Sequence, residues 1–364
     1  MPFALILILL SGLAVAGFTF RTLILAIFLV LCAAVLRAQR GPAREIIKIS
    51  DNLYRTRNGT WYGLVYVTPD GILLADPIST DFAGWVKSEL DRRFPGIPIR
   101  YIVYSHSHWD HIEGAAVFGD GPKVVAQEGV LRNMDGRYPH MPGDMIDRNN
   151  NGQFELEEIV GPGMAHPGIC GMPANFFQTH DRNHDGHMTP AEYYAEVRRP
   201  DIVYSDRMQL TLGGKTVELV FPGKNHADDG TVIVFPSERI AFAADFPADA
   251  LVRESLRSLP SACGNFDAHP VSEWIRSYKT IESLDFDQLA GGHGSALFKK
   301  SDVAEARQFF EDLVASVSAG MAAGKSLDDL KHTILLEKYS GWAYYQRLRE
   351  DNIEAAYNNL KIYK

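Results

Sequence analysis

The chain has 364 residues, of which 46% are hydrophobic and 22% are charged, and its formal net charge is −9. This length can bury a large core, as one big domain or as a core with insertions, and the composition is typical of a globular enzyme. The negative charge argues against a nucleic-acid partner, because phosphate binding requires a basic face. We therefore look for a small-molecule enzyme.

The first 39 residues differ in composition from the rest. Met1–Phe20 and Thr22–Leu36 carry no charged side chain, and Arg21 stands between them. The stretch is too long for one straight membrane crossing of about 20 residues. Arg21 and the apolar run after it match the charged and apolar regions of a secretory signal. We predict that residues 1–39 are a signal peptide or an N-terminal membrane anchor, so that the enzyme is exported (periplasmic or extracellular) or anchored outside the cytoplasm.

Two cysteines, Cys170 and Cys263, follow this leader. In an oxidising compartment they can form one disulfide bond, and they can equally be two buried thiols. The sequence leaves both alternatives open.

From Arg44 to about residue 135 the sequence predicts short strands and one long helix. Apolar runs bounded by turn residues indicate the strands, and a Pro-Asp-Gly turn joins two of them into a hairpin. The apolar spacing of Phe82–Phe94 indicates the helix, for which Ser79 or Thr80 supplies the N-cap. The strands are predicted over residues 46–49, 53–56, 61–68, 72–75, 99–104 and 123–126.

The segment Ser105–His111 directly follows the predicted strand Ile99–Tyr104. Residues 106 and 108 alternate with residue 107, so in extended backbone both imidazoles point to one side. Imidazole and carboxylate together suit zinc, and also iron or manganese. Such a density of ligands exceeds what one four-coordinate ion that keeps a water requires, so the segment predicts two ions. Its candidate ligands are His106, His108, Asp110 and His111.

Two segments after residue 136 match the calcium-binding loop D-x-[DN]-x-[DN]-G-x5-E completely. Side-chain oxygens at positions 1, 3 and 5 converge on the ion, position 7 offers its backbone carbonyl, and the glutamate at position 12 closes the coordination sphere. Two complete matches 34 residues apart (181 minus 147) are hard to attribute to chance. The predicted ligands are Asp147, Asn149, Asn151, Gln153 and Glu158 in the first loop, and Asp181, Asn183, Asp185, His187 and Glu192 in the second.

The two loops have unequal flanks. A helix is predicted over residues 174–179 before the second loop, and Pro190 begins another over residues 191–197 after it. Pro139 and Pro142 leave little room for a helix before the first loop. An exported enzyme also meets calcium at nearly constant concentration. We therefore predict that calcium stabilises this segment and does not regulate the enzyme.

The second half of the chain returns to short strands, and helices follow from Val271 on. The strands are predicted over residues 208–212, 216–221, 231–235 and 240–244, and long helices over residues 301–321 and 341–360. The aromatic residues Trp342, Tyr344 and Tyr345 are predicted to belong to the core. Three further metal-type residues stand at strand ends or in glycine-rich turns: His226, Asp245 and His293.

The segment His106–His111 resembles the H-x-H-x-D-H signature of the metallo-β-lactamase-fold superfamily, and the three later residues follow in that family's order. The resemblance covers about residues 45–135 and 200–300. It implies that His106, His108 and His226 hold a first ion, that Asp110, His111 and His293 hold a second, and that Asp245 bridges them. It also implies that Asp76 lies behind a metal-bound histidine and fixes its tautomer. A turn-initiating aspartate before Pro77 is the alternative reading of Asp76.

The resemblance implies an α/β fold, the four-layer αββα metallo-β-lactamase sandwich with an inserted EF-hand-like segment. The catalytic domain would comprise residues 44–135 and 201–300, with the EF-hand pair over residues 136–200. Residues 301–364 would form the C-terminal helical part of the same domain.

The predicted function is hydrolysis of an ester, thioester or lactone by a metal-bound hydroxide, with two zinc ions (or iron or manganese) and structural calcium. Asp110 is also predicted to carry a proton to the leaving group. A bridging aspartate at 245 resembles the glyoxalase II and lactonase branches, whereas β-lactamases usually have cysteine or serine there.

Several alternatives remain open at this point. A β-lactamase is one, although no lysine follows Asp245 in Phe246-Pro247-Ala248-Asp249. A calcium-responsive binding protein with a degenerate metallohydrolase core is another. A diiron oxidoreductase would require a carboxylate in place of His108, and an enzyme similar to the one-iron persulfide dioxygenases would not need the second ligand set.

Overall fold

The computed structural model describes residues 43–136, 149, 151–155, 176–246, 257–260 and 269–363. The predicted leader, Cys170, Cys263 and the calcium ligands Asp147 and Glu158 lie outside the described residues. Within the described part, no helix is long and apolar enough to cross a membrane.

The first sheet has seven strands in the order β1-β2-β3-β4-β5-β6-β9. Neighbouring strands are antiparallel from β1 to β4 and parallel from β4 to β9. Every strand predicted in this part of the sequence is present, with ends that differ by at most two residues. The strands are β1 (Arg44–Lys48), β2 (Leu53–Asn58), β3 (Trp61–Thr68), β4 (Gly71–Ala75), β5 (Ile99–Val103), β6 (Lys123–Gln127) and β9 (Ile202–Tyr204).

The second sheet has six strands in sequence order from β10 to β15, antiparallel except for the parallel pair β13 and β14. The predicted strand over residues 240–244 ends at Phe242, and Ala243 N still donates a hydrogen bond to Ala290 O beside it. The strands are β10 (Arg207–Leu212), β11 (Lys215–Val220), β12 (Val232–Phe235), β13 (Ile240–Phe242), β14 (Gln288–Ala290) and β15 (Leu297–Lys299).

The strand β3 shows how side-chain alternation builds the layers. Leu64 and Tyr66 lie in the apolar core between the two sheets, whereas Val65 and Val67 lie in a core on the other face of the first sheet. Because successive side chains of a strand point to opposite faces, a strand buried on both sides needs apolar residues at consecutive positions. The first sheet is therefore buried on both faces at this strand.

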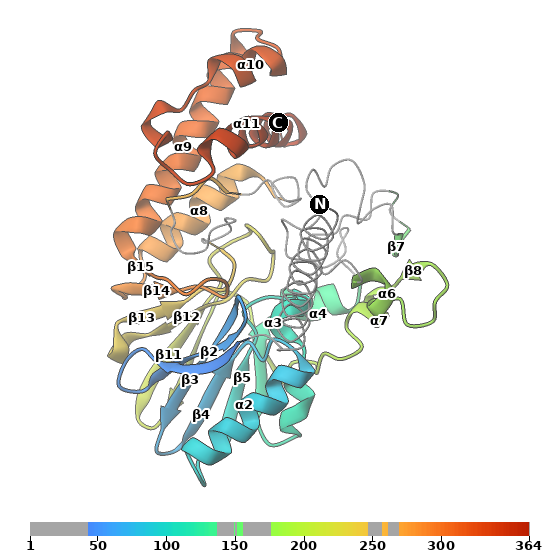
Figure 1. The fold of residues 1–364 in the computed structure, drawn as a ribbon, viewed down its shortest axis with the longest axis vertical. Coiled ribbons are helices and arrows are strands. Elements are labelled where there is room, and N and C mark those ends of the chain that lie inside the picture. Colours follow the sequence, from blue (N-terminus) through green and yellow to red (C-terminus); the bar gives the residue numbers. More distant parts are fainter. Residues whose placement is uncertain are drawn as a thin grey trace, which may run out of the picture. The chain divides into compact units, whose positions relative to one another are not determined.

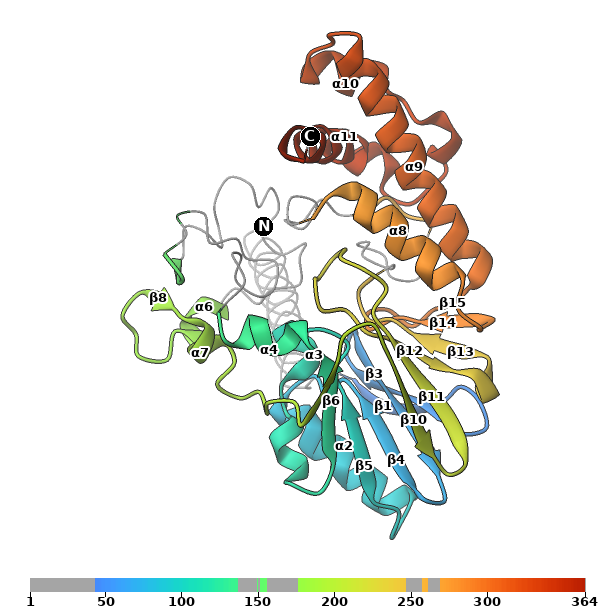
Figure 2. The ribbon, with the colours of Figure 1, turned by 180° about the vertical axis from the view of Figure 1, so that it is seen from behind.

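Helices cover the outer faces of the two sheets (Figures 1 and 2). On the first sheet lies α2 (Thr80–Arg93), capped by the Ser79 side chain as predicted and packed through Phe82 and Val86. On the second sheet lie α8 (Val271–Glu282) and α9 (Lys300–Ala322), in one core with β12 and β13, and α11 (Tyr345–Ile362) packs against α9 and α8. This gives the predicted α/β sandwich, with two sheets between helical layers.

The remaining short helices connect these layers. The predicted helix over residues 341–360 begins only at Tyr345, because Tyr344 adopts a left-handed backbone conformation with φ of 59°. Trp342, Tyr344 and Tyr345 pack in the core of the second sheet, as predicted. The short helices are α3 (Trp109–Ile112), η1 (Ala115–Phe118), α4 (Gly129–Met134), α6 (Phe176–His180), α7 (Pro190–Tyr193), η2 (Pro236–Glu238), α10 (Leu327–Thr333) and η4 (Glu337–Tyr339).

A two-stranded sheet lies outside the two large sheets. Its strands are β7 (Phe154–Glu155) and β8 (His187–Met188), with Phe154 opposite Met188. Phe154 and Met188 are position 8 of the two predicted calcium loops, and both are fully buried. The two loop segments therefore lie side by side through these strands (Figure 1).

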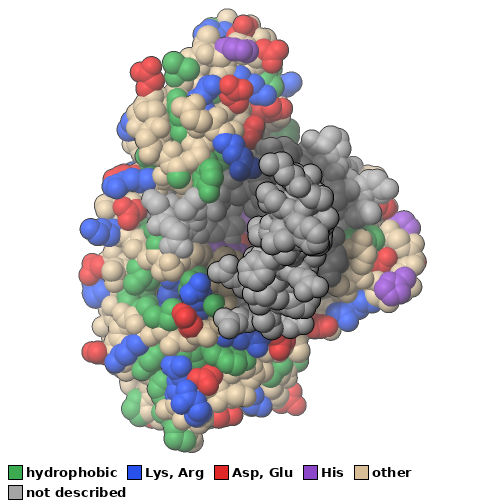
Figure 3. Space-filling model, viewed as in Figure 1, with side chains coloured by type: hydrophobic (Ala, Val, Ile, Leu, Met, Phe, Trp, Pro, Cys, Tyr) green, Lys and Arg blue, Asp and Glu red, His purple; other side chains and the backbone are tan. Residues whose placement is uncertain are grey.

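The surface carries charges of both signs. On the face drawn in Figure 3, the described Lys and Arg side chains are interspersed with Asp and Glu. Local pairs such as Arg239 with Asp285 and Asp287 are part of this pattern. Exposed pairs of this kind contribute little to stability, so the folded state depends mainly on the three apolar cores.

Candidate metal centre

The ends of the first sheet's parallel strands carry the histidine cluster. After β5 the chain passes through Ser105 into residues 106–108 and then into the single turn of α3. Ser105 is held from both sides, because its N–H donates to Asp76 Oδ1 at 2.9 Å and its carbonyl accepts from Thr231 N at 2.6 Å. The second of these bonds brings the loop that carries His226 against the cluster.

The parallel pair β13 and β14 brings the two remaining candidates together. Asp245 follows β13 and His293 follows β14, and Gly292 N donates to Ala244 O at 2.7 Å. A side chain at residue 292 would collide with the site, since a Cβ there would lie 2.8 Å from His111 Cε1. The Gly-Gly-His turn thus permits two histidines from distant parts of the chain to approach each other.

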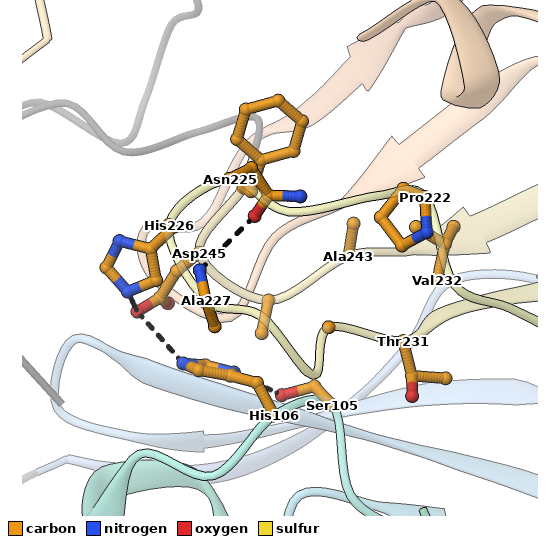
Figure 4. A pocket seen from close by; sticks show the side chains of 13 residues that line it. Ser105, His106, Pro222, Asn225, His226, Ala227, Thr231, Val232, Ala243 and Asp245 are labelled. Carbon is orange, nitrogen blue, oxygen red and sulfur yellow. Dashed lines mark hydrogen bonds and ion pairs between the residues drawn. The ribbon is translucent and has the colours of Figure 1, made fainter. Parts of the chain in front are cut away.

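The first group of donor atoms comprises His106 Nε2, His108 Nδ1, His226 Nε2 and Asp245 Oδ2. Figure 4 shows His106, His226 and Asp245 pointing toward one another. His226 Nε2 lies 3.0 Å from His108 Nδ1 and 3.2 Å from Asp245 Oδ2, and His106 Nε2 lies 3.6 Å from the same oxygen. Tetrahedral zinc with bonds of 2.0–2.1 Å requires ligand separations of about 3.3 Å.

The second group comprises Asp110, His111 and His293. His111 Nε2 lies 3.2 Å from His293 Nε2, and Asp110 Oδ2 lies 3.5 and 3.4 Å from these two nitrogens. Asp245 reaches this group through its other oxygen, Oδ1, which lies 3.1 Å from His111 Nε2 and 2.9 Å from His293 Nε2. One carboxylate therefore faces both groups. All seven residues predicted from the sequence converge here.

The fit to divalent ions rests on buried nitrogen and oxygen atoms that have no hydrogen-bond partner among the described residues. Among the described residues, His106 Nε2 and Asp245 Oδ1 are buried and make no contact with hydrogen-bond geometry. Buried polar atoms without partners are rare and costly in folded proteins. Imidazole nitrogens and carboxylate oxygens at these separations are the ligands that zinc takes. The residues present thus fit a pair of divalent ions.

Two polar side chains orient the imidazoles from behind. Asp76 is fully buried, and its Oδ2 lies 3.0 Å from His111 Nδ1. Asp76 also has a φ of 56°, as expected of a strained turn before Pro77, so it occupies the turn and contacts the histidine as well. Ser105 Oγ lies 2.9 Å from His106 Nδ1. Both contacts leave the Nε2 atoms facing the centre.

The electrostatics differ between the two groups. Burial, together with the neighbouring His108 and His111, lowers the pKa of His106 well below its usual value, and burial and His226 lower the pKa of His108 to about 3. For His111 burial acts in the same direction, but Asp245 and Asp110 outweigh it and raise its pKa well above the usual value. His106 and His108 are therefore neutral at neutral pH, whereas His111 carries a proton.

A buried network fixes the loop that carries His226. Asn133 Nδ2 donates to Asp228 Oδ1 at 2.9 Å, to Asp229 Oδ2 at 3.0 Å and to Ser107 Oγ at 3.2 Å. Burial, and then the charge of Asp228, raise the pKa of Asp229 to about 7. Through Asn133, α4 ties the two sides of the first group together. The sequence alone predicted no role for either aspartate.

Arg55 is another supporting residue whose role was not predicted from the sequence. It is 2% exposed, and its guanidinium donates to the carbonyls of Gly291, Gly294 and Ser295 at 2.7–2.8 Å. These carbonyls surround His293, so Arg55 fixes the loop that presents this histidine. The sequence could have indicated that Arg55 is buried. It stands two positions after Leu53 in the strand and therefore on the same, inward face.

The second predicted calcium loop is described throughout. Asp181 Oδ1 accepts from Asp185 N and its Oδ2 from Gly186 N, while Asp185 Oδ1 accepts from His187 N. Glu192 forms a capping box with Thr189 at the start of α7, which ends at Tyr193, four residues before the predicted end. The predicted ligands of this loop are thus gathered around one turn. Of the first loop, Asn149, Asn151 and Gln153 lie in the described residues.

This loop contacts the turn that carries two metal-type residues. Tyr193, the last residue of α7, is fully buried, and its hydroxyl accepts from Trp109 N at 3.1 Å. His180 Nε2, directly before the loop, lies 3.4 Å from Glu113 Oε1. The two ends of the loop therefore flank α3, the helix that contains Asp110 and His111.

Comparisons with known proteins cover most of this chain. A family model described as "Metallo-beta-lactamase superfamily" matches residues 56–293. The 2,4-dinitroanisole O-demethylase subunit alpha of Nocardioides sp. is 21% identical over 316 residues, which are 85% of this chain and 71% of the relative. The linear primary-alkylsulfatase of Pseudomonas sp. is 22% identical over 302 residues, 77% of this chain and 51% of the relative.

A solved structure shows the same fold. It is described as a stereoselective inverting sec-alkylsulfatase from Pseudomonas sp., and it aligns with a TM-score of 0.58 and 16% identity. The alignment covers 88% of this chain and 51% of that chain. The chain thus spans about half the length of both sulfatases.

Proposed function

The chain belongs to the metallo-β-lactamase superfamily and is a metal-dependent hydrolase, and from that premise we propose that it uses two divalent ions, zinc by preference, to hydrolyse an ester-type bond. The observation that carries the two-ion proposal is the orientation of Asp245. Its Oδ2 faces His226 at 3.2 Å and its Oδ1 faces His293 at 2.9 Å. A carboxylate that presents one oxygen to each of two ligand groups is suited to bridge two ions.

In the proposed arrangement, His106, His108 and His226 bind one ion, and Asp110, His111 and His293 bind the other. Ions held in this way lower the pKa of water toward neutrality and polarise the bond that is attacked. Asp76 and Ser105 keep the imidazoles in the orientation that binding requires.

Asp110 is the partly exposed carboxylate of the second group, and we propose that it carries a proton. Burial alone would raise its pKa, but His111 and His293 outweigh burial and hold the pKa below the usual range. It is therefore an anion at neutral pH, and its side chain is 15% exposed. The partial exposure supports its proposed role as proton carrier to the leaving group, whereas the lowered pKa favours the anion and by itself makes the carboxylate a weaker base.

The substrate class proposed from the ligand set is a carboxylic ester, thioester or lactone. The relatives widen the set that should be tested, since their names indicate cleavage of alkyl sulfates and of an aryl methyl ether. The part of the chain that lines the centre beside Asp245 is partly apolar, with Pro222, Val232 and Phe246.

Two measurements test the proposal. Elemental analysis of protein purified without added metal should give close to two transition-metal ions per chain. Fewer than one ion in a folded sample would refute the two-ion centre. The same protein should then be assayed on a nitrophenyl ester, a thioester, a lactone, a β-lactam, an alkyl sulfate and an aryl methyl ether. We expect turnover of an ester-type substrate, and absence of turnover on the whole panel would favour the binding-protein alternative.

A second proposed property is calcium binding by the paired loops. It is supported by the pairing of β7 with β8, which joins position 8 of one loop to position 8 of the other. It is also supported by the carboxylates of Asp181 and Asp185, which accept hydrogen bonds from backbone N–H groups of their own loop and so curve it around one point. Extracellular calcium modules bind with dissociation constants of about 0.1–1 mM, and we expect an affinity in this range.

A further inference from the structure

Trp61 is the first residue of β3 and directly follows the turn from β2. Its backbone is attached to the loop that carries His293. Two backbone hydrogen bonds, of 2.7 and 3.1 Å, join residues 60–62 to residues 292–294, and Trp61 itself forms a β-bridge with His293. The indole is thus held at a fixed place beside the second ligand group.

The indole Nε1–H of Trp61 donates a hydrogen bond to Asp110 Oδ2 at 2.9 Å. The same oxygen lies 3.5 Å from His111 Nε2 and 3.4 Å from His293 Nε2. The oxygen that accepts the indole proton is therefore the one that faces the other two donors of the group. A carboxylate oxygen has two lone pairs, so it can accept this bond and still bind an ion.

We propose that Trp61 is a positioning residue that holds Asp110 in the orientation needed for the second ion. This inference rests on the proposed role of Asp110 as a ligand. Indole suits the task because its N–H is a donor only and carries no charge. It fixes the direction of the carboxylate without cancelling the negative charge that attracts a cation.

Asp110 requires such a partner more than its neighbours do. It stands on the single turn of α3 and is partly open to solvent, whereas His111 is fully buried and held by Asp76. The terminal torsion of an aspartate is broad, so a partly exposed carboxylate samples several orientations unless a donor selects one. Among the described residues outside the ligand set, the indole is the donor that the structure shows on this carboxylate.

The test is Trp61→Phe in the full-length chain, which keeps an aromatic ring beside His293 and removes the N–H. Partners that orient a metal ligand are worth about tenfold to hundredfold in metal affinity. We expect the second zinc ion to bind more weakly by that factor in competition with a chromogenic chelator, while the first ion binds as in the wild type. The control is Trp85→Phe, because Trp85 stacks on Phe82 of its own helix and should leave both affinities unchanged.

A double mutant separates positioning from general packing. If Trp61 acts through Asp110, then Trp61→Phe should cause no further loss in an Asp110→Ala background. Three results would each overturn the inference. The second zinc ion could bind Trp61→Phe as tightly as the wild type, or both ions could lose affinity equally in that variant. The third is a loss of affinity in the double mutant that equals the sum of the two single losses. A wild-type protein that binds one ion would instead refute the two-ion centre itself, and Trp61 would then have no second site to serve.

Discussion

The metal centre and the loop Asp181–Glu192 both gather donor side chains, but they differ in what those side chains contact. In the centre, six of the seven donors are buried, and His106 Nε2 and Asp245 Oδ1 make no hydrogen bond among the described residues. In the loop, Asn183 and Asp185 are exposed, and carboxylate oxygens of Asp181 and Asp185 already accept hydrogen bonds from the loop's backbone.

The difference indicates what an ion would add in each place. Unsatisfied buried donors cost free energy in the folded protein, so an ion that binds them relieves that cost as well as adding its own bonds. A loop whose oxygens are exposed and already hydrogen-bonded gains less free energy when an ion binds. We therefore expect the centre to depend on its ions for activity and the loop to gain modest stability.

The largest effect is expected from Asp245→Ala. It removes the only side chain that faces both groups within the described centre, so the second ion should be lost and turnover should fall by about a hundredfold or more. His111→Ala and His293→Ala should give similar deficits. Elemental analysis and the ester assay measure both effects, with Asp285→Ala at an exposed position as control. Near-normal turnover with two bound ions would show that Asp245 does not bridge.

A smaller effect is expected from Arg55→Lys. A lysine cannot reproduce the fork that binds three carbonyls around His293, and hydrogen bonds from charged groups are worth about 1.5–3 kcal/mol each. The free energy of unfolding should fall by about 2–3 kcal/mol, measured by denaturant unfolding in the presence of chelator so that metal makes no contribution. Arg57→Lys is the matched control, since Arg57 lies two residues further along β2 and bonds to Gly59 in its own hairpin. An equal loss of unfolding free energy in the two variants would show that the bonds of Arg55 around His293 contribute no more than those of Arg57.

Much of the centre could be predicted from the sequence because its signals are local. Period-two apolar runs identify the strands, and four donors within six positions identify the cluster from His106 to His111. The supporting residues gave weaker signals, because their partners are remote in sequence. Arg55 bonds to residues about 240 positions away, and Trp61 donates to a carboxylate 49 positions away. Only the fold brings such pairs together.

The same reasoning explains the secondary-structure differences. Residues 191–197 have helical composition, but α7 ends at Tyr193. Tyr193 and Tyr194 are both buried there, and tertiary burial of this kind overrides local helix propensity. No local pattern reports that Tyr193 bonds to the backbone of α3.

The smallest effect is expected from calcium at the loop, and Glu192→Gln isolates it. Glutamine can keep the capping box with Thr189, since its side-chain oxygen still accepts from the backbone, while one charge on the ion is lost. Wild-type protein with calcium at ten times the dissociation constant should gain about 1.4 kcal/mol, seen as a higher melting temperature than with chelator selective for calcium. That gain should shrink in Glu192→Gln and persist in Glu196→Gln, whose side chain pairs with Arg182 outside the ligand set. Zinc content should be the same in all three proteins. If calcium instead changed turnover or zinc content at constant melting temperature, the contact of Tyr193 with α3 would transmit occupancy of the loop to Asp110 and His111, and the loop would be a regulator of the metal centre.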